Sequence, residues 1–176
     1  MGIQKLKISK RGLELIKFFE GLHDGDLSVI GLQPKVCPSG IFTVGYGHAL
    51  VNPKTGKFVK TKEELKLIPA GLLNMTEEDA VKLLDEDLDK FEAAVNKNLK
   101  VQLNQDQFDA LVSHTFNCGV SETLYKLINT MPFNSESIAI WWKTKYITAE
   151  GIKQNGLVKR RAVEYELFNT GKLNLK

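Results

Sequence analysis

Hydrophobic residues recur at helical spacing near the start of the chain, where Leu13 and Ile16 begin a run with a three-to-four residue period. Ser9 precedes this run and is a favourable N-cap residue. Gly21 follows the run and favours the end of a helix. The pattern therefore predicts a first helix whose last residue is Glu20.

The pattern changes between residues 22 and 58 to short segments separated by Gly and Pro. Residues 37–40, Cys-Pro-Ser-Gly, have proline at the second position and glycine at the fourth, as a type I turn prefers. This turn connects 33–36 with 41–46, and the three segments predict a β-hairpin. Residues 52–57 are predicted to form a loop.

The rest of the chain has helical periodicity. Thr76 and Asp79 have the spacing of a capping box, although Asp replaces the usual Glu or Gln, and they open a helical pattern of about 20 residues. Asn104 and Gln107 form a second box before a helix that Gly119 would end. Further helices are predicted near 121–129, 135–146 and 157–168.

This order of elements predicts an α+β fold that is mainly helical and has a small N-terminal sheet. We expect one domain over residues 1–176. It would contain a lobe with the small sheet over 12–75, a connecting helix over 76–98 and a helical lobe over 99–176, on which the N-terminal helix packs. In such a bilobal protein, a cleft between the lobes is the usual place for a site.

Composition excludes several classes of protein. The chain has 176 residues, of which 43% are hydrophobic and 26% charged, close to the average of globular proteins and unlike disordered or collagen-like chains. A net charge of +3 is too small to indicate nucleic acid as a partner. Cys37 and Cys118 have no metal or redox spacing, so we expect no metal and no other cofactor.

The first ten residues, MGIQKLKISK, contain no continuous apolar segment. No later segment approaches the roughly 18 apolar residues of a membrane span. We therefore expect neither a signal peptide nor a membrane anchor, and residence in the cytoplasm until another agent releases the chain.

Glu20 is the first candidate for chemistry. It would be the last residue of the first helix, where the helix dipole disfavours a negative charge. The neighbouring Phe18, Phe19 and Leu22 are apolar. Both effects favour the protonated carboxyl that a general acid needs. The alternative is a solvated glutamate at a frayed helix end.

Several blocks of the sequence resemble phage-type lysozymes, the endolysins with which bacteriophages open their hosts. They are ISKRGLELIKFFEGL (8–22), CPSGIFTVGYGHAL (37–50), and the pair 103–119 and 156–171. With the long predicted helix they follow the order of the family over most of the chain. The resemblance implies a lysozyme-like fold and hydrolysis of the β-1,4 bond between N-acetylmuramic acid and N-acetylglucosamine in peptidoglycan.

The resemblance also assigns catalytic residues. Glu20 would protonate the leaving glycosidic oxygen, and Thr43 would help to hold the attacking water. Cys37 stands where many members have Asp, and the family is known with Cys there. Its thiolate would act as a base or nucleophile, or stabilise positive charge on the sugar. Two alternatives stay open: an inert Cys37, or a carboxylate from Asp24 or Asp26 in the segment that lengthens the usual family spacing.

Three residues of the predicted helical lobe match substrate positions of the family. Phe116 and Asn117 match residues that line the sugar cleft. Arg160 matches an arginine beside the catalytic glutamate, where it would pair with Glu20 or bind substrate. The alternatives are a core role for Phe116 and a solvated helix face for Arg160.

Other matched or aromatic residues have predicted structural roles. His48 matches a family histidine that forms a salt bridge with an acidic residue of the long helix, here Asp87. Tyr46, Trp141 and Trp142 could stack on sugar rings, although tryptophans more often fill a core.

Two other functions remain open beside the lysozyme. A lytic transglycosylase would cleave the same bond and leave 1,6-anhydro ends, and a catalytically inactive module would only bind the cell wall. The expected partner in every case is the peptidoglycan glycan strand. We expect a monomer, and the family implies dependence on a holin-like membrane permeabiliser.

Overall fold

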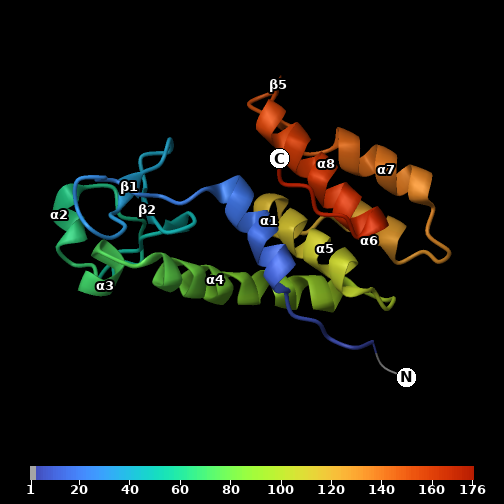
Figure 1. Cartoon of the computed structure of the whole chain (residues 1–176), viewed down its shortest axis with the longest axis horizontal. Coiled ribbons are helices and arrows are strands. Elements are labelled where there is room, and N and C mark those ends of the chain that lie inside the picture. Colours follow the sequence, from blue (N-terminus) through green and yellow to red (C-terminus); the bar gives the residue numbers. More distant parts are fainter. Residues whose placement is uncertain (1–2) are drawn as a thin grey trace. The chain divides into compact units, whose positions relative to one another are not determined.

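A computed structural model describes residues 3–176 of the chain (Figure 1). These residues form two compact units. The helical unit consists of residues 3–19 and Leu88–Lys176, and the sheet unit consists of Glu20–Asp87. In each unit, turns and helix caps set the ends of the elements, and buried hydrophobic side chains hold the elements together.

The sheet unit contains a small antiparallel sheet. Its strands are β1 (Lys35–Val36), β2 (Phe42–Val44) and β3 (His48–Ala49), with β2 in the centre. The register places Thr43 opposite Lys35 on one side and opposite Ala49 on the other. In the predicted turn, the N–H of Gly40 donates to the carbonyl of Cys37 at 2.9 Å. The predicted hairpin is therefore confirmed, with shorter strands than the sequence indicates.

Helices complete the sheet unit. They are the short α2 (Lys62–Leu65) and α3 (Ala70–Leu73), which were not predicted as separate elements, and the first half of α4 (Glu77–Asn98). The hydrophobic core of this unit contains residues of β2, of α4 and of the segments between the elements, among them Phe42, Val44, Leu50, Val59, Ile68, Met75, Ala80 and Leu84. Because β2 is buried on both faces, its side chains have fixed surroundings.

The helical unit is organised around one buried helix. Its elements are α1 (Lys10–Glu20) up to Phe19, the second half of α4, α5 (Gln105–Cys118), α6 (Glu122–Ile128), α7 (Ser135–Thr144) and α8 (Asn155–Thr170). Helix α5 packs against α8, and α7 packs against both α6 and α8 (Figure 1). Every residue from Phe108 to Thr115 is buried. Helix α5 is therefore the centre of this unit.

The predicted helix starts are confirmed by their caps. The Ser9 hydroxyl accepts hydrogen bonds from the N–H groups two and three residues later. Thr76 and Asp79 exchange side-chain and backbone hydrogen bonds, as do Asn104 and Gln107. These contacts satisfy backbone N–H groups that have no partner inside the helix. The helix that begins after Thr76 is α4, the longest described helix, as expected.

The sequence analysis missed a second sheet. Strands β4 (Thr148–Ala149) and β5 (Ile152–Lys153) pair in an antiparallel hairpin. The two turn residues, Glu150 and Gly151, both have positive φ, at 51° and 77°, as a two-residue hairpin turn of type I′ requires. Strands of two residues are too short to show an alternating pattern in the sequence.

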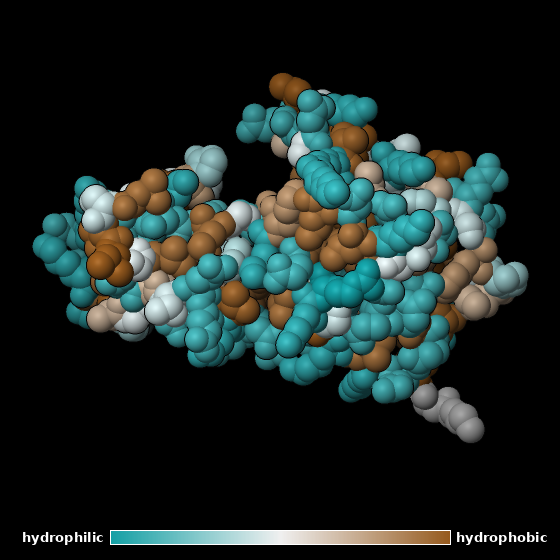
Figure 2. Space-filling model, in the orientation of Figure 1, coloured by the Kyte–Doolittle hydropathy of each residue, from teal (hydrophilic) through white to brown (hydrophobic). Residues whose placement is uncertain are grey.

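Hydrophobic side chains also lie on the surface of the sheet unit (Figure 2). The most exposed are Leu27 and Ile30, which are 89% and 94% exposed. Both lie in the segment between α1 and β1. None of the helices in residues 3–176 is long and apolar enough to span a membrane.

Candidate active site

Glu20 lies where helix α1 ends and the sheet unit begins. The next residue, Gly21, has a φ of 68°, which ends the helix as predicted. Glu20 is partly exposed, and its carboxylate lies near the turn between β2 and β3. A Cβ atom added to Gly47 would be 3.8 Å from Glu20 Oε2. The Glu20 carboxylate therefore lies close to Gly47, where the absence of a side chain leaves space beside it.

His23 connects the end of α1 to the central strand. Its N–H donates to the carbonyl of Gly45 at 2.7 Å, and its ring Nδ1 is 2.7 Å from Thr43 Oγ1. The ring also forms a hydrogen bond with the backbone of Glu20. Burial and the charge of Lys35 lower the pKa of His23, so the imidazole is neutral at neutral pH.

His23 was not among the predicted site residues. It is 20 residues from Thr43 in the sequence, and no motif relates the two positions. The isolated β-bridge between His23 and Gly45 brings the imidazole to the central strand. This contact depends on the path of the chain after Gly21, which the sequence analysis treated only as the end of a helix.

Thr43 occupies the middle of β2 and is 5% exposed. Its hydroxyl lies between the His23 ring and the backbone of β1, where Lys35 O is 3.2 Å from Thr43 Oγ1. The two neighbours satisfy a hydroxyl that the strand would otherwise bury without a partner. The hydroxyl of Thr43 and the backbone of Glu20 thus bond the same imidazole.

Cys37 lies at the first position of the turn that follows β1. Its thiol is partly exposed and 2.9 Å from the hydroxyl of Ser39. The hydrogen bond with Ser39 lowers the pKa of the Cys37 thiol, and backbone N–H groups contribute in the same direction. A lowered pKa increases the fraction of thiolate, which is the nucleophilic and basic form of cysteine.

Asp24 and Asp26 use their carboxylates within their own loop. Asp24 Oδ1 accepts hydrogen bonds from the N–H groups of Asp26 and Gln33. Asp26 Oδ1 accepts from both the N–H and the hydroxyl of Ser28. These are the local contacts by which aspartate stabilises turns. Both carboxylates thus bond groups of the segment between α1 and β1.

The predicted salt bridge of the sheet unit is confirmed. His48 Nδ1 of β3 is 2.8 Å from Asp87 Oδ2 of α4.

The three aromatic residues that could stack on sugar rings are buried in the structure and do not line an open site. Tyr46 and Trp141 are each 6% exposed, and Trp142 is fully buried. They fill the cores of their units.

Arg160 does not lie on a solvated face of α8. It is 3% exposed, and its Nε donates to Glu164 Oε1 at 3.2 Å. Its guanidinium lies 5.6 Å from the centre of the Phe19 ring. The adjacent Lys159 is exposed, and its ammonium group lies over the Phe18 ring. Of the three consecutive basic residues Lys159, Arg160 and Arg161, the lysine is therefore exposed and both arginines are buried.

Phe116 and Asn117 lie in the last turn of α5. Phe116 is partly exposed and makes an edge contact with Phe91, with 5.1 Å between ring centres. Asn117 is exposed, and its side-chain oxygen accepts a hydrogen bond from Arg161 at 3.0 Å. Both side chains keep surface that a ligand could contact.

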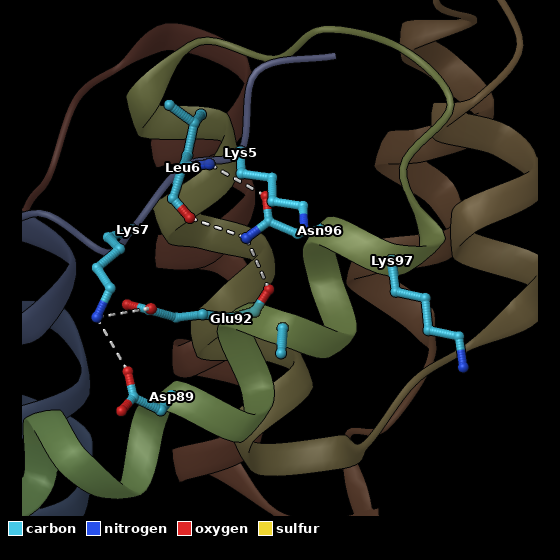
Figure 3. A pocket seen from close by; sticks show the side chains of 8 residues that line it. Lys5, Leu6, Lys7, Asp89, Glu92, Asn96 and Lys97 are labelled. Atoms are coloured by element: carbon cyan, nitrogen blue, oxygen red, sulfur yellow. Dashed lines mark hydrogen bonds and ion pairs between the residues drawn. The ribbon is translucent and has the colours of Figure 1, made fainter. Parts of the chain in front are cut away.

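A pocket in the helical unit lies elsewhere, between the N-terminal segment and α4 (Figure 3). Leu6 and Asn96 exchange two hydrogen bonds there, and Lys7 forms an ion pair with Asp89. These contacts hold the N-terminal segment on α4. The pocket contains none of the predicted site residues.

Within the described part of the chain, no three His, Cys, Asp or Glu residues are arranged to hold a metal ion.

Solved structures with a similar fold include a phage endolysin and a muramidase domain. The endolysin from Escherichia coli O157:H7 phage FAHEc1 superposes with a TM-score of 0.76 and is 32% identical, over 98% of this chain and 99% of that one. The muramidase domain of SpmX from Asticaccaulis excentricus superposes with a TM-score of 0.67 and is also 32% identical, over 93% and 98% of the two chains. The predicted lysozyme-like fold is therefore confirmed.

The sequence pattern of the phage lysozyme family matches residues 27–164. The match includes Cys37, Thr43 and Arg160. The chain therefore belongs to the phage lysozyme family. The endolysin of Bacillus phage B103 is 35% identical over 170 residues, which are 94% of this chain and 55% of the phage protein. The chain thus spans about half the length of this relative.

Proposed function

We propose that the chain hydrolyses the β-1,4 bond between N-acetylmuramic acid and N-acetylglucosamine in peptidoglycan, with Glu20 as the general acid. One observation carries this proposal. Glu20 and Thr43, both in family positions, are connected by His23 within the sheet unit: its ring bonds the backbone of Glu20 and the Thr43 hydroxyl, and the Glu20 charge acts on the same ring. A glycosidase needs such a proton donor and a group that directs the attacking water. The names of its relatives, endolysin and muramidase, support the same reaction.

In the proposed reaction, Glu20 gives its proton to the glycosidic oxygen as the bond from that oxygen to the sugar C1 breaks. A water molecule held by the Thr43 hydroxyl attacks C1, and its released proton passes to the Cys37 thiolate. The products are a reducing N-acetylmuramic acid end and a free 4-hydroxyl on N-acetylglucosamine. The lowered pKa of Cys37 supports its use as a base. Direct attack by Cys37 would instead retain the anomeric configuration.

For substrate binding we propose Phe116 and Asn117. A partly exposed aromatic ring can stack on a sugar, and an exposed amide can both donate to and accept from an N-acetyl group. Arg160 has the same predicted role from the family resemblance. Because its guanidinium is buried, we expect it to act through the side chains that it contacts.

The proposals for the whole protein rest on the family alone. They are the glycan strands of peptidoglycan as the partner, a monomeric state and a holin-type membrane permeabiliser as a functional requirement. The corresponding location is the cytoplasm of the bacterial host until lysis. The permeabiliser and the location would be tested by expressing the protein in bacteria with and without permeabilisation of the membrane, and measuring degradation of the cell wall in each case.

The test of the reaction is mass spectrometry of fragments released from purified peptidoglycan. The wild type should release fragments with reducing N-acetylmuramic acid ends. Glu20→Gln should reduce the rate by at least about 100-fold, as loss of a general acid does. Cys37→Ala tests the second group in the same assay. Glu14→Gln, an exposed position of the same helix, is the matched control and should retain wild-type activity.

Each outcome assigns the protein to one mechanism. Loss of release in both Glu20→Gln and Cys37→Ala supports the proposed pair. If Cys37→Ala keeps its activity, water alone or a carboxylate of Asp24 or Asp26 takes that role. Fragments with 1,6-anhydro ends would make the protein a lytic transglycosylase. No release at all, with the protein sedimenting with the wall, would leave a binding module.

A further inference from the structure

The contacts of His23 fix its imidazole at the Thr43 hydroxyl. Its backbone is held by the 2.7 Å hydrogen bond to Gly45, and its ring is held by Glu20 on one side and Thr43 on the other. The ring is only partly buried, so it can exchange protons with solvent. The ring therefore bonds the backbone of one predicted catalytic residue and the side chain of the other.

The Thr43 hydroxyl has one proton and two neighbouring acceptors. These are His23 Nδ1 at 2.7 Å and the carbonyl of Lys35 at 3.2 Å. A carbonyl oxygen can only accept, whereas a ring nitrogen accepts when it is unprotonated and donates when it is protonated. The protonation of Nδ1 therefore decides to which side the hydroxyl proton points.

We propose that His23 is a positioning residue for hydrolysis, which orients the Thr43 hydroxyl toward the attacking water. This inference rests on the proposed function. With Nδ1 unprotonated, the hydroxyl donates to the ring, and its oxygen keeps lone pairs that accept a hydrogen bond from water. With the ring protonated, Nδ1–H donates to the same oxygen, and the hydroxyl proton turns to Lys35. The ring N–H then occupies a lone pair of the Thr43 oxygen that otherwise accepts from the water, and the water is held in a different direction.

The charges around His23 favour the neutral ring at neutral pH. Lys35 of β1 lowers the pKa of His23 and Glu20 of α1 raises it, while burial, the largest influence, lowers it. Thr43 of β2 and Gly45, which follows β2, have no charged side chain, and the carboxylate of Asp24 is engaged by backbone N–H groups of its own loop. The rate should therefore fall as the pH decreases below the ordinary imidazole pKa of about 6.5.

The experiment measures kcat and KM for release of reducing ends from purified peptidoglycan between pH 4.5 and 8. His23→Ala should lower kcat at pH 7.5 by about tenfold with little change in KM, as expected for loss of one hydrogen bond that orients a reacting group. In His23→Asn, the side-chain oxygen can accept from Thr43 near the place of Nδ1. This variant should recover most of the loss.

The pH profile separates positioning from a structural role. Asn does not titrate, so the ratio of the wild-type kcat to that of His23→Asn should fall as the pH decreases below about 6.5. Lys35→Met removes a charge that lowers the pKa of His23, and should move the acidic limb to higher pH. Circular dichroism at each pH confirms that the variants remain folded.

Two results would overturn the inference. One is a kcat of His23→Ala within twofold of the wild type. The other is a ratio of wild type to His23→Asn that does not change with pH. Either result with an active wild type leaves the proposed function intact. A wild type that releases no fragments refutes the proposed function itself.

Discussion

Glu164 of α8 accepts a hydrogen bond of 2.7 Å from the Ser113 hydroxyl of α5, and both side chains are fully buried. The same carboxylate accepts from the Trp142 indole at 3.2 Å and from the guanidinium groups of Arg160 and Arg161 at 3.2 and 2.9 Å. One acidic group thus partners donors from three helices. Buried guanidinium groups need an opposite charge and hydrogen-bond acceptors, so the polar interior of the helical unit depends on Glu164.

Glu164→Gln should therefore destabilise the protein by about 3–5 kcal/mol, because it leaves two buried cations without their carboxylate. The free energy of unfolding, measured by urea denaturation, checks this value. Glu166 on the same helix is partly exposed, so Glu166→Gln is the control and should change the free energy of unfolding by less than about 0.5 kcal/mol. A loss below about 1 kcal/mol for Glu164→Gln would show that the carboxylate has no such role.

His114 of α5 is a second buried titratable group. It is 1% exposed and lies among the rings of Trp141, Trp142 and Tyr146. Its Nε2 has no hydrogen-bond partner among the described residues. Burial, reinforced by the charge of Arg161, lowers the pKa of His114 to about 3. The folded protein thus keeps this ring neutral in mild acid.

Stability should consequently fall as the pH decreases from about 6.5 toward 3. In this interval the unfolded chain binds a proton at His114 and the folded chain does not, which costs up to about 1.4 kcal/mol per pH unit. His114→Phe removes this group. In urea denaturation between pH 7 and 4, the free energy of unfolding of the variant should decrease less steeply than that of the wild type. Parallel curves would contradict the lowered pKa, whatever their offset.

Local sequence signals predicted the parts of the fold that depend on neighbouring residues. The caps at Thr76 and Asn104 were predictable because each bonds a residue three positions later. The β4–β5 hairpin was not, because its strands are short and its turn requires Glu150 in a left-handed conformation that glutamate rarely adopts. Such a conformation is imposed by the rest of the fold.

The candidate site divides in the same way. Glu20 became a candidate through its helix end and Thr43 through the family motif, whereas His23 was not considered because its partner Thr43 is 20 residues away. The solvated helix face, which was the alternative for Arg160, is wrong because this side chain is buried and bonds Glu164. The signal was Glu164, four residues later, because residues at that spacing lie on one face of a helix.

The salt bridge between His48 and Asp87 should contribute measurably to stability. Both side chains are about three-quarters buried, at 27% and 26% exposed, so solvent weakens the pair less than a surface pair. A double-mutant cycle with His48→Asn and Asp87→Asn should give a coupling energy of about 1–2 kcal/mol. The exposed Glu78–Lys82 pair of the same helix is the matched control and should give less than about 0.5 kcal/mol. Equal coupling in the two pairs would contradict this expectation.

The two cysteines should react at very different rates with iodoacetamide. Cys37 is partly exposed and its thiol pKa is lowered by Ser39, whereas burial raises the pKa of Cys118. Because the thiolate is the reacting form, Cys37 should be alkylated at least about tenfold faster at pH 7.5, as followed by mass spectrometry of peptides. Ser39→Ala should slow Cys37 by about twofold or more, while Ser135→Ala in α7 should not. Equal rates for the two thiols, or no effect of Ser39→Ala, would show that Ser39 does not activate Cys37, and would weaken the case for its thiolate as the base.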